Sequence, residues 1–156
     1  MEKMTDYAEL LLTTYSEYNT VMTGSGADFT LVLRNPERTD GDLTVTAREG
    51  RFNLRFFSMD EDFGGDFGEL VSFTDELLHD ESMIFELHAA GEYLLGGSRG
   101  TDELGAYRSK KKLLAALADG DPCLAEEIEE ITAREHCFVR LRGWRAARCY
   151  SIILTK

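Results

Sequence analysis

The chain has 156 residues, a length typical of one domain, and 43% of them are hydrophobic, which argues against a disordered protein. No apolar run approaches the roughly 20 residues that span a bilayer, and acids interrupt the apolar stretch of the N-terminus, unlike in a signal peptide. The formal net charge is -12, and because such a field repels phosphates and anionic lipids, it disfavours nucleic acid and membranes as partners.

The first half of the chain predicts one helix followed by a three-stranded antiparallel meander. Tyrosine and leucine residues at helical spacing predict a helix over 6–18, capped by Thr5. The glycine-containing stretch at 23–28 is expected to break this helix. Three strand-like runs follow, at 28–34, 42–49 and 51–58.

A two-residue turn at Glu49 and Gly50 sets the register of the second and third strands, because glycine tolerates positive φ. Closing this turn pairs Arg48 with Arg51. The apolar residues of the two strands then all lie on one face, as the pairs Ala47–Phe52, Val45–Leu54 and Leu43–Phe56. The other face is wholly polar, so the predicted register is internally consistent.

The second half predicts helices and strands in alternation. A helix is expected over 69–78, a hairpin over 82–97 with its turn at Ala90 and Gly91, and a helix over 109–120. Asp121 followed by Pro122 is a helix start signal. Two final strands are expected within 136–144 and 148–156. The fold class is therefore α+β: a single domain over 1–156, with a three-stranded meander and a C-terminal hairpin packed against about four helices, in the order α-βββ-α-β(β)-αα-ββ.

The stretch SMDEDFGGDFGEL, at 58–70, contains two Asp-Phe-Gly triplets. The other sequence motifs of protein kinases are absent, and the calcium loop of an EF-hand would need a glutamate where Val71 stands. We interpret residues 59–62 as a charged loop in solvent and Gly64 and Gly65 as a chain reversal. Asp66 and Glu69 then form a capping box at the start of the next helix.

The candidate catalytic and metal motifs are weak. GGSRG at 96–100 fits the Gly-x-Ser-x-Gly pattern of serine hydrolases, with Ser98 as nucleophile, but that motif belongs between a strand and a helix of a parallel sheet. The three histidines have no metal-ligand spacing. We therefore expect no catalytic residue, no metal, no cofactor and no enzymatic activity. With no export signal, the cysteines are expected to be reduced, buried thiols of a cytoplasmic protein: Cys123, Cys137 and Cys149.

Charge is segregated along the chain. Residues 56–105 hold thirteen acids against one base, Arg99, so this segment carries twelve net negative charges and the rest of the chain sums to zero. We expect the segment to bind a basic protein surface, because complementary fields raise association rate and specificity. The residues predicted to bind the partner are Asp60, Glu61, Asp62, Asp66 and Glu69.

A basic patch near the C-terminus combines four arginines with an aromatic residue: Arg140, Arg142, Trp144, Arg145 and Arg148. Such a patch can bind phosphates or stack on bases. However, Arg140 and Arg142 alternate with apolar residues, as on the wet face of a sheet, and the arginines can instead pair with the acidic segment within the molecule or across a dimer.

Three functions stay open at this level. The first is a protein-interaction or inhibitor module, of the toxin-neutralising or host-factor-blocking type, that presents a negative surface to a basic partner. The second is a nucleic-acid mimic that blocks a nuclease or a CRISPR effector. The third is an unrecognised enzyme or a small-ligand-binding domain with a pocket between the sheet and the helices.

Overall fold

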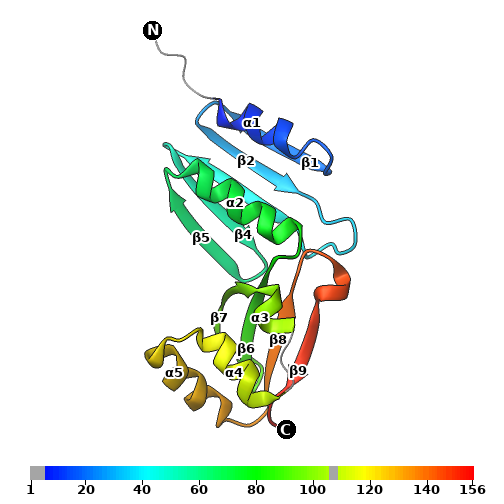
Figure 1. Ribbon diagram of the computed structural model, residues 1–156. Helices are drawn as coiled ribbons and strands as arrows, with labels where there is room; N and C mark the ends of the chain where they lie inside the picture. Colours follow the sequence, from blue (N-terminus) through cyan, green and yellow to red (C-terminus); the bar gives the residue numbers. More distant parts are fainter. Residues whose placement is uncertain (1–5, 106–108) are drawn as a thin grey trace. The chain divides into compact units, whose positions relative to one another are not determined.

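The computed structural model describes residues 6–105 and 109–156 and is an α+β fold with antiparallel sheets (Figure 1). The chain divides into two compact units, Met1–Thr74 and Asp75–Lys156. The first unit has a five-stranded sheet in the order β1-β2-β3-β4-β5, and the second a four-stranded sheet in the order β7-β6-β8-β9. The meander and the C-terminal strands therefore belong to different sheets, whereas we expected one. That the chain is a single domain stays a prediction.

The first unit places a helix before and after an unbroken meander. Its elements are α1 (Tyr7–Thr14), β1 (Thr20–Ser25), β2 (Asp28–Leu33), β3 (Leu43–Arg48), β4 (Arg51–Phe56), β5 (Met59–Gly64) and the start of α2 (Phe67–Leu78).

The predicted register of β3 and β4 is confirmed. Arg48 lies opposite Arg51, and each apolar residue of β3 lies opposite the apolar partner expected from the alternation. Glu49 and Gly50 both have positive φ, 52° and 79°, as a two-residue hairpin turn requires. The apolar face is almost inaccessible to solvent. Its residues are Phe29, Leu31, Leu33, Leu43, Val45, Ala47, Phe52, Leu54 and Phe56.

The two outer strands of this sheet differ from our expectations. The segment 23–28 does not simply end a helix, because Gly24 closes β1 against β2 at φ 83°, where an added Cβ would meet the Asp28 carbonyl oxygen at 2.5 Å. Residues 59–64 are strand β5, paired with β4, and not a solvent loop. Helix α1 is shorter than predicted and is capped by the Asp6 carboxylate, which accepts from the Glu9 N–H at 3.1 Å. Thr5 lies outside the described residues.

The second unit contains β6 (Ser82–Ala89), β7 (Glu92–Gly100), α3 (Thr101–Gly105), α4 (Lys110–Ala118), α5 (Pro122–Thr132), β8 (Cys137–Arg142), a 3₁₀ turn (Ala146–Arg148) and β9 (Tyr150–Ile153). The turn at Ala90 and Gly91 and the Asp121 cap of α5 agree with the sequence prediction. Helix α3 was not predicted.

Alternation along β6 and β8 divides the second sheet into two faces. One face packs against the helices through Met83, Phe85, Leu87, Cys137, Val139 and Leu141, which join Leu113, Leu117, Ile128 and Ile131 in one core. The opposite face carries Glu86, which lies next to Arg140 in the register. Cys137 and Cys149 are buried and partly buried, but Cys123 is exposed, because it stands in the first turn of α5.

The connection between β8 and β9 is held by a buried carboxylate at the start of the second unit. Asp80 is 6% exposed and accepts from the Trp144 N–H at 3.1 Å, the Arg145 N–H at 3.4 Å and the Arg145 side chain. An added Cβ on Gly143 would come within 2.9 Å of the same carboxylate, so glycine permits this close approach. Among the described residues, no helix is long and apolar enough to cross a membrane.

Candidate functional site

One end of the first sheet brings together turns that are distant in sequence. The strand register places the β1–β2 turn, the β3–β4 turn and the end of β5 at the same end of the sheet, since Ser25 pairs with Asp28 and Phe52 pairs with Gly64. Both helices also begin here. The ring of Tyr7 on α1 lies 5.2 Å from Phe52, and the ring of Phe67 on α2 lies 5.5 Å from Phe52.

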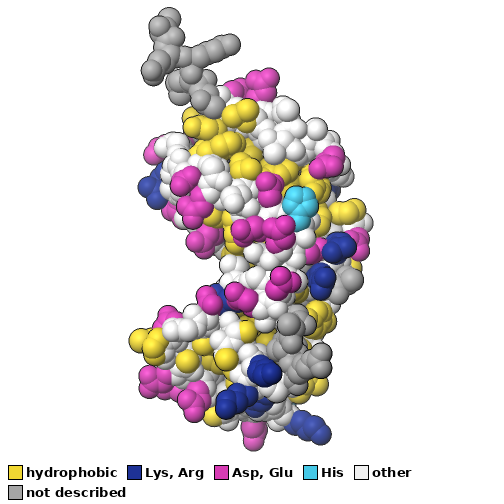
Figure 2. Space-filling view, in the orientation of Figure 1, with side chains coloured by type: hydrophobic (Ala, Val, Ile, Leu, Met, Phe, Trp, Pro, Cys, Tyr) yellow, Lys and Arg dark blue, Asp and Glu magenta, His cyan; other side chains and the backbone are white. Residues whose placement is uncertain are grey.

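Exposed carboxylates gather at this end, which we call the acidic end. Its five acids come from the α1 cap, the start of β2, the β3–β4 turn, the end of β5 and the cap of α2: Asp6, Asp28, Glu49, Asp62 and Asp66. Figure 2 shows acidic side chains beside hydrophobic ones on this part of the first unit, at the upper left of the view.

Local hydrogen bonds hold several of these acids in place. The Asp28 carboxylate accepts from the Glu49 N–H at 3.0 Å, and the Asp66 carboxylate accepts from the Glu69 N–H at 3.0 Å. Asp6 and Asp66 each cap a helix, where a negative charge is favoured by the helix dipole. The carboxylates are therefore fixed to turns and helix starts rather than carried on free segments.

Two arginines share the acidic end, and both have local partners. Arg51 pairs with Asp62 at 3.0 Å, and Arg48 donates to the carbonyl oxygens of Phe29 and Ala47. The pKa of Asp62 is lowered, first by the Gly64 N–H that its carboxylate accepts at 2.7 Å and second by Arg51. Asp62 is thus ionised at neutral pH, and the five acids outnumber the two arginines.

A pocket of about 330 Å³ opens at the acidic end, with Asp6 as the one acid among the described residues that line it. It is lined by Asp6, Tyr7, Gly26, Ala27, Phe29, Gly50 and Phe52. Gly26 and Gly50 have positive φ, and an added Cβ at either position would touch nothing within 4 Å. The pocket has aromatic walls and a carboxylate at its rim, and this combination suits a cationic group because the face of an aromatic ring is negative.

The predicted partner-binding residues divide between two parts of this unit. Asp62 and Asp66 lie at the acidic end, and Glu69 lies in the first turn of α2. Asp60 and Glu61 lie further from that end on β5, where Asp60 pairs with Arg55 at 3.6 Å and contacts Asn53.

Sequence reasoning missed Asp6, Asp28 and Glu49. The predicted hairpin turn already located Glu49 at one end of the meander. However, neither β1 nor the position of α1 against the sheet was predicted, so nothing indicated that the three acids converge.

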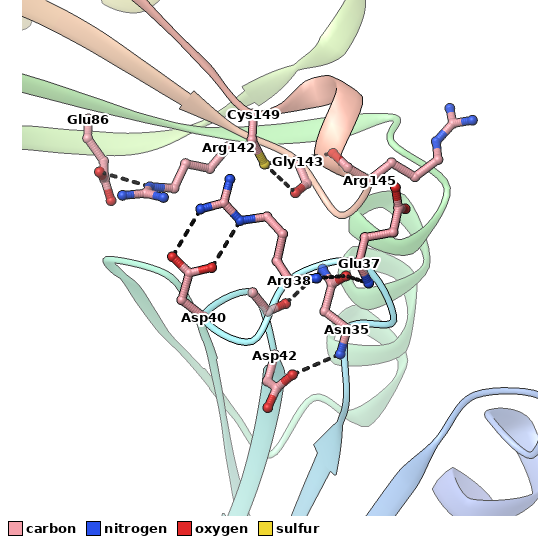
Figure 3. Close-up of polar contacts among 11 residues, drawn as sticks. Asn35, Glu37, Arg38, Asp40, Asp42, Glu86, Arg142, Gly143, Arg145 and Cys149 are labelled. Carbon is pink, nitrogen blue, oxygen red and sulfur yellow. Dashed lines mark hydrogen bonds and ion pairs between the residues drawn. The ribbon is translucent and has the colours of Figure 1, made fainter.

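The predicted basic patch is divided among different environments. Arg142 donates to Glu86 at 3.2 Å, and both side chains are mostly buried (Figure 3). Arg145 pairs with Asp80, and Arg140 lies over the Phe138 ring at 5.5 Å. Two of the four arginines therefore pair with carboxylates of the acidic segment, which is one of the alternatives that the sequence left open.

Trp144 and Arg148, the remaining members of that patch, differ in exposure. Trp144 is 5% exposed, so its ring lies inside the fold, whereas Arg148 is exposed. Phosphate or base binding by the patch stays a prediction.

The weak chemical motifs fall in regular structure. Ser98 lies within the antiparallel hairpin of β6 and β7, opposite Ile84, and not in a turn between a strand and a helix of a parallel sheet. Within residues 6–105 and 109–156, no group of three or more His, Cys, Asp and Glu side chains is arranged to hold a metal ion.

Comparisons of the chain with models of protein families, with curated proteins and with solved structures found no match.

Proposed function

We propose that this protein is a small acidic interaction or inhibitor module, of the toxin-neutralising or host-factor-blocking type, that presents the acidic end of its first unit to a basic protein. The observation that supports this most is the convergence of five exposed carboxylates at one end of the first sheet, beside an aromatic pocket with Asp6 at its rim. A field of one sign around a hollow attracts a partner of opposite charge and orients it before contact.

The pocket favours an arginine side chain of the partner as the group that enters it. Guanidinium is planar, stacks on aromatic rings and forms bidentate hydrogen bonds with carboxylates. Tyr7 supplies a partly exposed ring above the buried Phe52, and Asp6 supplies a carboxylate at the rim. Aromatic anchoring at the centre with charged groups around it is the arrangement expected for binding hot spots.

The test uses a charge reversal that leaves the fold intact. Glu49 is exposed and stands in a hairpin turn, where its backbone N–H and not its side chain bonds to Asp28, so Glu49→Lys changes the field alone. Glu92→Lys is the matched control, because Glu92 is an exposed acid next to the hairpin turn of the second unit.

The probe is a short arginine-rich peptide, titrated by NMR at two salt concentrations. We expect the peptide to shift the signals of Tyr7, Gly26 and Gly50, and Glu49→Lys to weaken binding about tenfold, while Glu92→Lys changes it less than twofold. A lysine peptide of equal charge is expected to bind more weakly than the arginine peptide. Equal losses in the two variants, or shifts confined to other surfaces, would show that the acidic end is not the binding site.

A further inference from the structure

The second unit has a groove along its helical hairpin. Helices α4 and α5 run antiparallel, and between them lies a groove of about 730 Å³, a volume typical of small-molecule sites. It is lined by Lys110, Lys111, Leu114, Ala115, Ala118, Ala125, Ile128, Glu129 and Thr132. Ala115 and Ala125 are exposed, so their small side chains form an apolar floor that is open to solvent, whereas Ile128 is 2% exposed.

The two ends of this groove differ in chemistry. Because the helices are antiparallel, Lys110 and Lys111 at the start of α4 lie at the same end as Thr132 at the end of α5. The other end is formed by Ala118 and Ala125, and a smaller hollow continues from there past Pro122. The groove thus has one polar, mainly basic end and one apolar end.

The charge at the start of α4 is unusual for a helix. All three residues of its first turn are lysines, and the turn contains no acid. The helix dipole is positive at this end, so cations are disfavoured there and an anion is favoured. Lys110 donates to the Leu154 carbonyl oxygen at 3.3 Å, and Lys111 lines the groove and is exposed. In an otherwise acidic chain, this turn is complementary to an anion.

We propose that the α4–α5 groove binds a free single-chain carboxylate of medium length, with its head group at Lys110 and Lys111 and its alkyl chain along Ala115, Ala118 and Ala125. The nine residues of α4 extend over about 13 Å, which accommodates a chain of roughly ten carbons. The head group gains charge-assisted hydrogen bonds from the lysines, and the chain leaves water for an apolar floor.

The surroundings of the groove favour a free ligand over a bilayer surface. Glu126, Glu127 and Glu130 are exposed on α5, and Glu129 lines the groove itself. An anionic membrane would meet these carboxylates together with the lysines and would be repelled by them. A single chain that lies in the groove meets only Glu129 of these four acids, together with Lys110 and Lys111.

The first experiment is an NMR titration of the full chain with hexanoate, octanoate and decanoate, each below the concentration at which it forms micelles. We expect shifts along α4 and α5, and an affinity that rises about threefold for each added methylene. Decylammonium is expected to bind at least tenfold more weakly than decanoate, because it places a cation beside the lysines. Absence of chain-length dependence, or equal binding of decylammonium, would overturn the proposal.

Three variants separate the head-group site from the apolar floor. Lys111→Glu is expected to weaken decanoate binding about tenfold, whereas Lys112→Glu, the matched control in the same helical turn, changes it less than threefold because Lys112 does not line the groove. Ala115→Phe fills the groove from an exposed position and is expected to abolish binding. Equal effects of the two lysine variants, or normal binding by Ala115→Phe, would contradict the site.

Vesicles of anionic phospholipid form the last arm of the experiment. We expect them not to bind the protein at physiological salt. Vesicle binding that survives Ala115→Phe would show that the lysines recognise a lipid surface, and it would overturn the proposal of a free ligand.

Discussion

Replacement of Asp80 tests whether its buried hydrogen bonds hold the second unit together. In Asp80→Ala, the buried Trp144 N–H loses its carboxylate acceptor, and an unsatisfied buried donor costs about 1–3 kcal/mol. Asp80 also has φ 56°, a left-handed conformation that costs alanine roughly 1 kcal/mol more than aspartate or asparagine. The Arg145 N–H, at 3.4 Å in an exposed residue, can turn to water and adds little. The sum is a loss of about 2–4 kcal/mol.

Two further variants show how much of this loss of stability comes from the backbone N–H bonds and how much from the Arg145 side chain. Asp80→Asn keeps the left-handed conformation and one acceptor oxygen, so it is expected to cost about 1 kcal/mol. Arg145→Met removes the side-chain pair with Asp80, in which the arginine is 59% exposed, and is expected to cost about 0–1 kcal/mol, as is usual for solvated pairs. The order of stability is therefore wild type, Arg145→Met, Asp80→Asn and Asp80→Ala, with the first two variants close together.

The assay is urea unfolding followed by tryptophan fluorescence. Trp144 is the one tryptophan of the chain and is 5% exposed, so its emission reports on the second unit. With an m value of about 1.5 kcal/mol/M, Asp80→Ala should lower the midpoint by roughly 2 M. If Asp80→Ala is no more destabilising than Arg145→Met, within about 0.5 kcal/mol, the buried N–H bonds do not carry the stability assigned to them. Circular dichroism of the same samples guards against a purely local change around the indole.

Three other expectations can be checked with simple measurements. Gly143→Ala would bring a Cβ to 2.6 Å from the Arg148 Cβ, so it should cost about 1–3 kcal/mol in the same urea assay; Gly100→Ala, with ordinary contacts near 3.8 Å, should cost less than half as much. Iodoacetamide should modify exposed Cys123 at once and buried Cys137 only on unfolding, since burial also raises the pKa of the Cys137 thiol; equal rates would contradict its burial. The pKa of Asp62 is lowered, so its contribution to stability is present above the ordinary pKa of 3.8 and is lost as the pH falls. Arg51→Gln should raise this pKa only partly, because the Gly64 N–H lowers it more than Arg51 does. A full return to 3.8 in an NMR titration would show that Arg51 has the larger effect.

The inner strands of the first sheet were predictable because two independent signals agree on them. Alternation assigned one face of β3 and β4, and a glycine turn fixed their register. The edge strand β5 lacks both signals. Its sequence carries three consecutive acids, and it is joined to β4 by Phe57 and Ser58, with Phe57 at φ 54°. Charges are common on edge strands because they prevent pairing with other chains, so a charged edge strand resembles a loop in sequence.

The division into two sheets rests on contacts that no local pattern encodes. Strand β6 pairs on one side with β7, which the glycine turn at Ala90 and Gly91 indicated. On its other side β6 pairs with β8, for example Phe85 with Leu141, across more than fifty residues. Period-2 alternation predicts that each segment is a strand, but it is equally satisfied by any partner with an apolar face. The C-terminal strands were therefore predicted as strands and placed in the wrong sheet.

The same limit applies to charge. Counted along the sequence, the acids of residues 56–105 form one block, yet the fold assigns Asp60 to Glu69 to the first unit and the acids from Asp75 onward to the second. Two acids of the second unit, Glu86 and Asp80, are mostly buried there and accept hydrogen bonds from arginines. An exposed concentration of acids instead arises where Asp28 and Glu49, outside that block, join Asp62 and Asp66 at one end of a sheet. A partner responds to the carboxylates that share a surface, so the turns that register brings together decide the binding field more than the density of acids along the chain does.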